Sequence, residues 1–99
     1  MDNGSSDKPS LTSAERSKLR GLAQTLDPKV FVGKLGVNDG IAKLLEDAFK
    51  NADLVKVRFN AERDVMEQQA QALAKLTHSE IIGSVGRTAT FFKLGKSEE

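Results

Sequence analysis

Segments with helical periodicity alternate with short strand-like segments along this chain, and that order constrains the fold more than any single motif does. Some segments carry apolar residues at spacings of three and four, whereas others are short and rich in β-branched or aromatic residues. Strand–helix–strand units cross over with parallel strands, and a final hairpin adds an antiparallel strand. We therefore expect an α/β protein of the α+β two-layer type, with the order α-β-α-β-α-β-β and a four-stranded mixed sheet. The predicted elements are helix 12–27, strand 29–32, helix 38–52, strand 54–59, helix 62–76, strand 80–85 and strand 88–93.

Local signals mark several of these boundaries. Thr12 and Glu15 have the spacing of a capping box, in which a hydroxyl and a carboxylate each accept a hydrogen bond from a free amide of the first turn. Pro28 ends the first helix, because the residue before a proline is disfavoured in helical conformation. Asn38 is a suitable cap for the second helix, and Gly86-Arg87 predicts the tight turn of the last hairpin.

The first helix is predicted to be amphipathic. Arg16 and Arg20 lie one turn apart, away from its apolar side. We expect the helix to bury its apolar stripe and to leave both arginines free. The stripe consists of Leu19, Leu22, Ala23 and Leu26.

The two faces of the predicted sheet differ. Strand 54–59 alternates apolar and basic residues, which is typical of a sheet with one dry and one wet side. Crossovers of the same hand place the second and third helices on one face, so the other face is either open or covered by the first helix. An open face would offer a stacking platform for unpaired bases. Its outward side chains would be Lys29, Phe31, Lys56, Arg58, Thr90 and Phe92.

Composition limits the chemistry of the chain. Its 99 residues suffice for one domain, which we expect over residues 11–96 after a disordered polar tail at 1–10. The absence of Cys excludes disulfides and cysteine metal sites, and the single His78 falls at a predicted helix end, where it is suited to capping or solvent exposure. We therefore expect no enzyme activity, no cofactor and no metal site.

The hydropathy and charge of the chain bear on where the protein is located in the cell and on what it binds. No apolar run is long enough to span a bilayer, and acids stand where a secretory signal would carry bases, so we expect a cytoplasmic protein. The net charge is only +1, but residues 11–36 sum to +3 and residues 37–53 to −2. Such a dipolar surface can steer an anionic partner, although scattered bases are also an ordinary solvated face.

The sharpest local motif is Gly33-Lys34-Leu35-Gly36, between a predicted strand and a capped helix. Two glycines let a polyanion approach main-chain amides closely, and the helix that follows directs its free amides and positive dipole end to the same place. Taken alone, the motif is most simply an ordinary turn, and phosphate contact is the alternative. Gly83-Ser84-Val85-Gly86 repeats the pattern within the predicted hairpin.

These segments together resemble the CRM domain, in particular the stand-alone bacterial YhbY type of RNA-binding protein. The resemblance covers roughly residues 11–94. It implies a fold similar to the C-terminal domain of initiation factor three, association with precursors of the large ribosomal subunit, and a GxxG loop in contact with RNA. The matching runs are Leu19-Arg20-Gly21-Leu22-Ala23-Gln24 with Leu26 and Pro28, Val30 with Val32-Gly33-Lys34 and Gly36-Val37, Leu54-Val55-Lys56-Val57, and Gly83–Lys93 with Val85-Gly86-Arg87-Thr88.

The family motif is carried over residue by residue, with two departures. Asn38 stands where relatives usually have a hydroxyl cap, and it caps equally well. Phe92-Lys93 stands where the last strand of relatives usually has Tyr-Arg, so stacking and charge are kept while the phenolic hydroxyl and the guanidinium fork are not. The predicted RNA-binding residues are Gly33, Lys34, Leu35, Gly36, Asn38, Arg16, Arg20, Lys56, Arg58, Arg87, Phe92 and Lys93.

Two functions are compatible with these residues. The first is that of a monomeric RNA-binding protein that associates with precursor large-subunit ribosomal RNA, with no membrane and no small-molecule substrate involved. The alternative is that of a protein-interaction adaptor whose acidic second helix and its flank, with Glu46, Asp47 and Asp53, dock a basic ribosomal protein.

Overall fold

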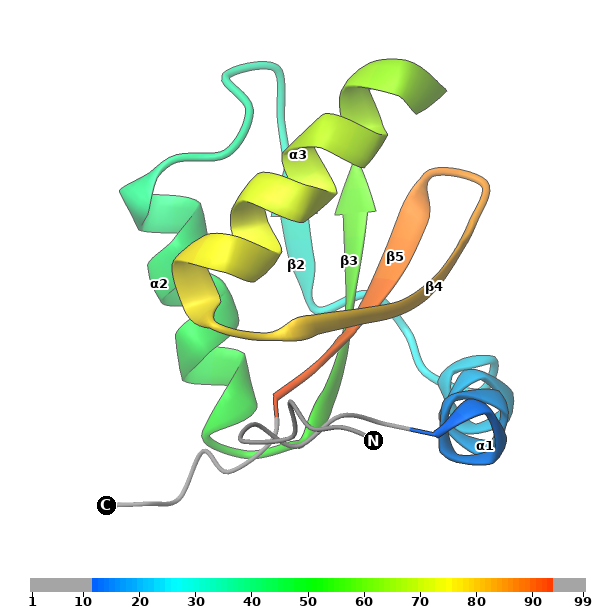
Figure 1. Cartoon of the computed structure of the whole chain (residues 1–99). Coiled ribbons are helices and arrows are strands. Elements are labelled where there is room, and N and C mark those ends of the chain that lie inside the picture. The colour runs from blue at the N-terminus through cyan, green and yellow to red at the C-terminus, as the bar shows by residue number, and fades with distance from the viewer. Residues whose placement is uncertain (1–11, 94–99) are drawn as a thin grey trace, which may run out of the picture.

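The structure, a computed structural model, describes residues 12–93, so the predicted tail at 1–10 and the domain end at 94–96 lie outside the described residues. Within this range the predicted order of helices and strands is confirmed (Figure 1). The elements are α1 (Ser13–Ala23), β2 (Val30–Val32), α2 (Asp39–Phe49), β3 (Leu54–Phe59), α3 (Arg63–Thr77), β4 (Glu80–Val85) and β5 (Thr88–Phe92).

The four strands form one mixed sheet in the order β2-β3-β5-β4. Strands β2 and β3 are parallel, with Val30 beside Val57, as a strand–helix–strand unit requires. Strand β5 pairs antiparallel with both β3 and β4 and so separates them. The register of β4 shifts between Ile81 and Gly83, which places a bulge in this edge strand.

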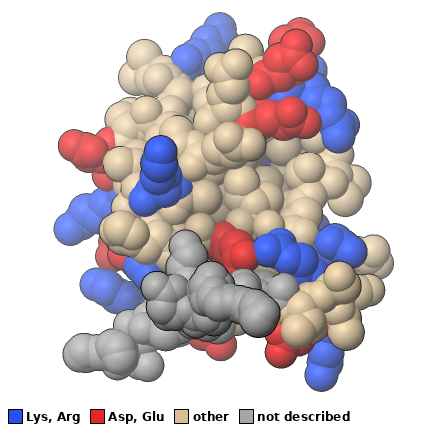
Figure 2. Space-filling view, viewed as in Figure 1, with Lys and Arg blue, Asp and Glu red and all other residues tan. Residues whose placement is uncertain are grey.

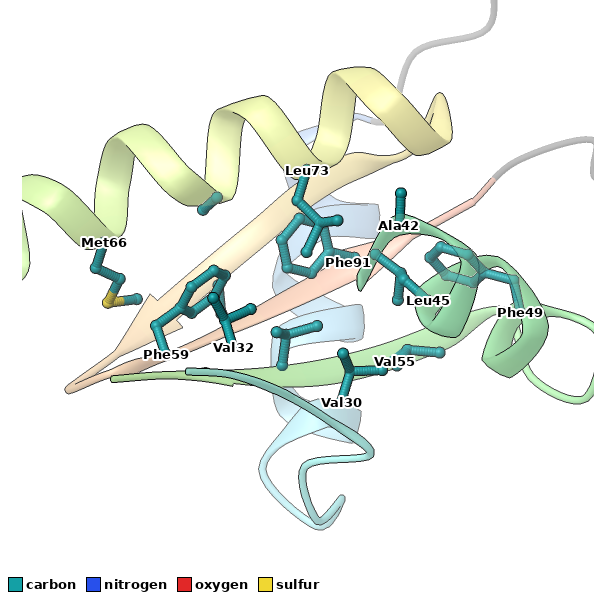
Figure 3. Packing of buried hydrophobic residues seen from close by; sticks show 13 residues of the cluster. Val30, Val32, Ala42, Leu45, Phe49, Val55, Phe59, Met66, Leu73 and Phe91 are labelled. Atoms are coloured by element: carbon teal, nitrogen blue, oxygen red, sulfur yellow. The ribbon is translucent and has the colours of Figure 1, made fainter. Parts of the chain in front are cut away.

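The hydrophobic core lies between one face of the sheet and the helices α2 and α3 (Figure 3). Phe59 and Phe91 from the sheet have ring centroids 6.5 Å apart, and Leu73 of α3 and Leu45 of α2 are fully buried against this layer. The placement of α2 and α3 on the same face is therefore as predicted. The cluster comprises Val30, Val32, Ala42, Leu45, Phe49, Val55, Val57, Phe59, Met66, Ala70, Leu73, Ala89 and Phe91.

Helix α1 lies apart from α2 and α3 and contacts β3 and β4 (Figure 1). It covers part of the second sheet face, where Thr90 is only 5% exposed. The expected apolar stripe is buried only in part: Ala23 is buried and Leu19 and Leu26 are partly buried, but Leu22 remains 53% exposed. The second face is therefore neither fully open nor fully covered.

Two helix ends differ from the prediction by more than one residue. Helix α1 ends at Ala23, four residues before Asp27, because the chain tightens into turns in which Thr25 and Leu26 donate to the carbonyls of Leu22 and Ala23. Helix α2 ends at Phe49 rather than at residue 52. His78 does end α3, in a left-handed conformation with φ 54°, and its side chain is exposed.

The surface in Figure 2 carries charges of both signs, intermixed around its margin, while uncharged residues form its middle. On the face shown in Figure 2, the Lys and Arg side chains of the described residues therefore do not form a single basic patch. Among residues 12–93, no helix is long and apolar enough to cross a membrane.

Candidate functional site

The Gly33–Gly36 segment forms a tight exposed turn directly after β2. The amide of Gly36 donates to the carbonyl of Gly33 at 3.0 Å, which places Lys34 and Leu35 at the corner of the turn. Leu35 is 92% exposed, and the Lys34 side chain is also exposed, with no hydrogen bond or ion pair to any described residue. The turn therefore presents an apolar and a cationic side chain that serve no visible packing role.

Helix α2 begins immediately after this turn. Asn38 is its N-cap, and the side-chain oxygen of Asn38 accepts a hydrogen bond from the amide of Ile41 at 3.0 Å, as the sequence predicts. The first amides of a helix have no partner within the helix, and its N-terminus carries a partial positive charge. Asp39 in the first turn partly offsets that charge, so Lys34 is the main source of positive potential at the turn.

Gly36 meets two separate constraints. Its φ of +80° lies in the left-handed region that favours glycine. A Cβ built there would also stand 3.1 Å from the Nε2 atom of Gln69, which reaches the turn from α3. The Oε1 atom of Gln69 is buried and accepts no hydrogen bond from the described residues. The turn thus rests against the α3 layer as well as extending β2.

A second cation lies at the same end of the sheet as this turn. Arg87 occupies the β4–β5 turn, and its carbonyl accepts a hydrogen bond from the amide of Phe59 at the end of β3, at 2.8 Å. The carbonyl of Val32 at the end of β2 accepts from the amide of Asn60 at 2.9 Å, so both turns adjoin the carboxyl ends of β2 and β3 (Figure 1). The Arg87 side chain is exposed and makes no hydrogen bond or ion pair with the described residues.

The second sheet face divides into a covered part and an open part. Lys56 lies in the covered part, and its Nζ atom donates to the carbonyl of Leu26 beyond α1 at 3.1 Å. Arg58 and Phe31 are register partners in the open part. Phe31 is 61% exposed, and Arg58 is exposed with no hydrogen bond or ion pair to a described residue.

Arg16 and Arg20 attach α1 to the edge strand β4 and are not free, contrary to the expectation from the sequence. Arg16 donates to the carbonyl of Ile81 at 3.2 Å and forms an ion pair with Glu80. Arg20 donates to the carbonyl of Ile82 at 3.3 Å. The two arginines thereby satisfy carbonyls near the bulge of β4. The Arg20 side chain also borders a cavity of about 90 Å³ between the helix and the sheet.

Phe92 and Lys93 lie at the opposite end of the sheet from the Gly33–Gly36 turn. Phe92 pairs with Leu54, the first residue of β3, and is half-buried. Lys93 donates to Glu46 at 3.0 Å, and its Nζ atom stands 5.9 Å from the centroid of the Phe49 ring. The structure therefore does not bring these two predicted residues together with the turn.

The second GxxG pattern has a structural role. Gly83 lies in β4 beneath α1, and Gly86 adopts a φ of +60° in the turn of the hairpin. Neither glycine precedes a helix. The surroundings of the two copies therefore differ, and only Gly33–Gly36 adjoins a helix N-terminus.

Phe31 and Gln69 complete the surroundings of the turn. Phe31 was predicted only as an outward side chain of the second sheet face, and Gln69 was not predicted at all. The alternation of Val30 and Val32 with Phe31 does indicate that the ring points away from the core. No sequence signal identifies Gln69, because its proximity to Gly36 depends on how α3 packs. Among residues 12–93, no group of three or more His, Cys, Asp or Glu side chains could hold a metal ion.

Comparisons with known proteins agree on one family. Residues 11–93 match the model of the CRS1 / YhbY (CRM) domain. The chain is 34% identical over 91 residues to the "Probable RNA-binding protein YqeI" of Bacillus subtilis, covering 90% of this chain and 94% of that protein. It is 25% identical over 84 residues to a protein of Haemophilus influenzae named "RNA-binding protein", covering 84% of this chain and 85% of that protein.

The fold agrees with the same comparison. The solution structure of the Staphylococcus aureus protein SAV1595 superposes with a TM-score of 0.78 at 30% sequence identity, covering 91% of this chain and 93% of that one. The similarity therefore extends over most of the length of both chains.

Proposed function

Because the chain belongs to the CRS1 / YhbY (CRM) domain family, we propose that it is an RNA-binding protein and that its target is the RNA of precursor large ribosomal subunits. Relatives that are similar to this chain over most of their length carry names that describe RNA binding. The proposal assigns the protein a monomeric, cytoplasmic and non-catalytic role. Such a role requires a surface that binds a polyanion, and it requires no catalytic side chain.

The observation that carries this proposal is the exposed Gly33–Gly36 turn at the N-terminus of α2. A phosphate placed over the turn would meet the Lys34 ammonium and the free amides at the helix start. Gly33 has no atom within 4 Å of the position a Cβ would occupy, so a sugar-phosphate backbone can approach it closely. Leu35 offers an apolar contact beside the charge.

Among the predicted cations, the intramolecular contacts suggest an order of importance for RNA. Lys34, Arg58 and Arg87 have no partner among the described residues, so binding a phosphate would break no internal interaction. Arg16, Arg20, Lys56 and Lys93 already have partners. We propose that the first three make direct contacts and that the arginines of α1 and Lys56 contribute through their remaining donors.

The adaptor alternative has less support. Glu46 accepts a hydrogen bond from Lys93, and Asp47 pairs with Lys50 at 3.4 Å. Both carboxylates are therefore already partly neutralised by bases of this chain, which weakens their attraction for a basic protein.

The deciding experiment replaces Lys34 and Leu35 by Asp and leaves both glycines in place. Like charges at the phosphate position should reduce affinity for a ribosomal RNA fragment by at least about tenfold, with the melting temperature close to wild type. Lys75→Asp with Leu76→Asp is a matched control, because it changes an exposed Lys-Leu pair on α3 by the same charge.

Tenfold loss in the loop variant and near wild-type binding in the control would support the proposal. Equal loss in both variants would indicate a general charge effect, and full binding by the folded loop variant would contradict a role for the turn. Cosedimentation of the wild-type protein with precursor large subunits, abolished by nuclease, tests the proposed target.

A further inference from the structure

One row of the second sheet face is left open by α1, and it runs across all four strands at the end nearest the Gly33–Gly36 turn. The pairing register places its members side by side. Helix α1 covers the neighbouring row, which contains Lys56, Thr90 and Gly83, and the cavity beneath the helix also reaches Thr88 and Val85 at the border of the open row. The open row consists of Phe31, Arg58, Thr88 and Val85.

Two members of the open row expose large apolar side chains. Phe31 is 61% exposed and Val85 is 77% exposed. An aromatic ring left in water on a strand is unusual, because strands generally turn such residues toward a core or a partner. Val30 and Val32, on either side of Phe31, are both buried, so the strand already has its full set of core contacts without this ring.

The charge beside the ring is positive and unpaired among the described residues. Arg58 is the register partner of Phe31 on β3, and adjacent strands lie about 4.8 Å apart. Among the second-face strand residues, Glu80 is the acidic one, and it lies at the far end of β4 in an ion pair with Arg16. An anionic partner would therefore meet no carboxylate of the described strands near Phe31.

The open row is continuous with the proposed phosphate site. Phe31 precedes Gly33 by two residues, which corresponds to roughly 7 Å along an extended strand. A ligand that places a phosphate over the turn can thus reach the ring with its next planar group. An aromatic ring and a cation beside a phosphate site are suited to bind a nucleotide whose base is unpaired, because the ring can stack on the base and the cation can contact a phosphate.

We propose that Phe31 is a stacking site for an unpaired RNA base, with Arg58 holding the adjacent phosphate, so that the protein selects single-stranded segments over duplex RNA. This inference rests on the proposed RNA-binding function and specifies the class of RNA. In this arrangement the turn at Gly33 contacts the sugar-phosphate backbone of the RNA. The Phe31 ring adds a stacking contact that a base paired within a duplex cannot make.

The absence of Trp and Tyr from the chain permits a direct test. Phe31→Trp introduces the sole strong fluorophore at the proposed site, and Leu76→Trp introduces it at an exposed position of α3 as a control. The probes are a short single-stranded RNA of mixed sequence and the same strand in a blunt duplex. We expect the single strand to quench the fluorescence of the Phe31→Trp protein, with little change for the duplex or for the control.

Affinity supplies the second measurement. Phe31→Leu keeps an apolar side chain but removes the ring, and it should weaken binding of the single strand by about fivefold or more while changing duplex binding much less. Phe31→Tyr should bind like the wild type. Circular dichroism and melting temperature verify that each variant is folded.

Several outcomes would overturn the inference. Selective stacking would be excluded if Phe31→Leu bound the single strand with wild-type affinity, or if it lost equal affinity for both probes. The proposed function would remain supported in either case, provided that replacing Lys34 and Leu35 by Asp reduces RNA affinity as expected. Sedimentation showing a dimer that Phe31→Leu dissociates would assign the ring to contact between copies instead. Failure of the wild-type protein to bind either probe would reject the proposed function and this inference together.

Discussion

The side chain of Arg20 lies directly over Gly83, so that a Cβ built on Gly83 would stand 2.8 Å from the Cδ atom of Arg20. The contact explains why β4 carries a glycine where α1 crosses it. It also joins the helix to the strand at the point where Arg20 donates to the carbonyl of Ile82. The first helix is thus attached through arginine stems and guanidinium groups more than through leucines.

Gly83→Ala should lower the free energy of unfolding by about 1 kcal/mol, because the new methyl group displaces the middle of the Arg20 side chain and disturbs its hydrogen bond. Urea denaturation measures the change. Gly21→Ala in the exposed last turn of α1 is the control of opposite sign, since nothing lies within 4 Å of its Cβ position and alanine favours helix by up to about 1 kcal/mol. Equal stability of the two variants would show that Arg20 does not pack on Gly83.

Gly36→Ala should also be destabilising, by about 1 kcal/mol, because of its positive φ and its proximity to Gln69. Gly33→Ala should leave thermal stability nearly unchanged, since its Cβ position is open. RNA affinity then distinguishes the two glycines. Weaker RNA binding by the stable Gly33→Ala protein would indicate close approach of a phosphate backbone, whereas unchanged binding would mean that no ligand comes near this glycine.

A double-mutant cycle over Arg16 and Glu80 should give a coupling free energy of about 0.5 kcal/mol. The value is small because about a third of each side chain is exposed to solvent, which screens the pair. The coupling should decrease when the salt concentration is raised from about 50 mM to about 500 mM, because added salt shortens the screening length. A coupling of zero at low salt would leave the Ile81 carbonyl as the significant partner of Arg16.

The affinity for RNA should fall as salt rises, because each neutralised phosphate releases condensed counterions. Arg58→Gln should make the slope of log affinity against log salt concentration shallower by about one unit, because one phosphate contact is lost. Lys75→Gln removes an exposed cation on α3, far from the open row, and should leave the slope unchanged. The same slope for the wild type and both variants would remove Arg58 from the RNA contacts.

Sequence periodicity predicted the elements well because their signals are local. The capping box is observed in full, with Glu15 donating its amide to the Thr12 hydroxyl and accepting from the Thr12 amide. The end of α1 was less predictable. Thr25 donates its hydroxyl to the carbonyl of Leu22 at 2.8 Å and so competes with continuation of the helix, a side-chain effect that apolar spacing does not reveal.

The site was predicted in part, and the reason is geometric. The Gly33–Gly36 turn and Asn38 are contiguous in sequence, so their arrangement follows from local rules. The surroundings of each cation depend instead on which surface α1 covers, and that surface is chosen by contacts between residues more than sixty positions apart, such as Arg16 with Ile81. Helical spacing placed Arg16 off the apolar stripe and could not show that a strand edge lies there.

Strand β5 is inserted between β3 and β4, although it follows both of them in the chain. A ribosome delivers the strands in chain order, so β2 and β3 can pair early while β4 emerges without a neighbour in the sheet. Phe91 of β5 is fully buried, which leaves the core short of a central ring until that strand arrives. In the native topology one edge of β3 and the whole of β4 therefore lack their partner until β5 is added, so the sheet can be completed only after the last strand has been synthesised.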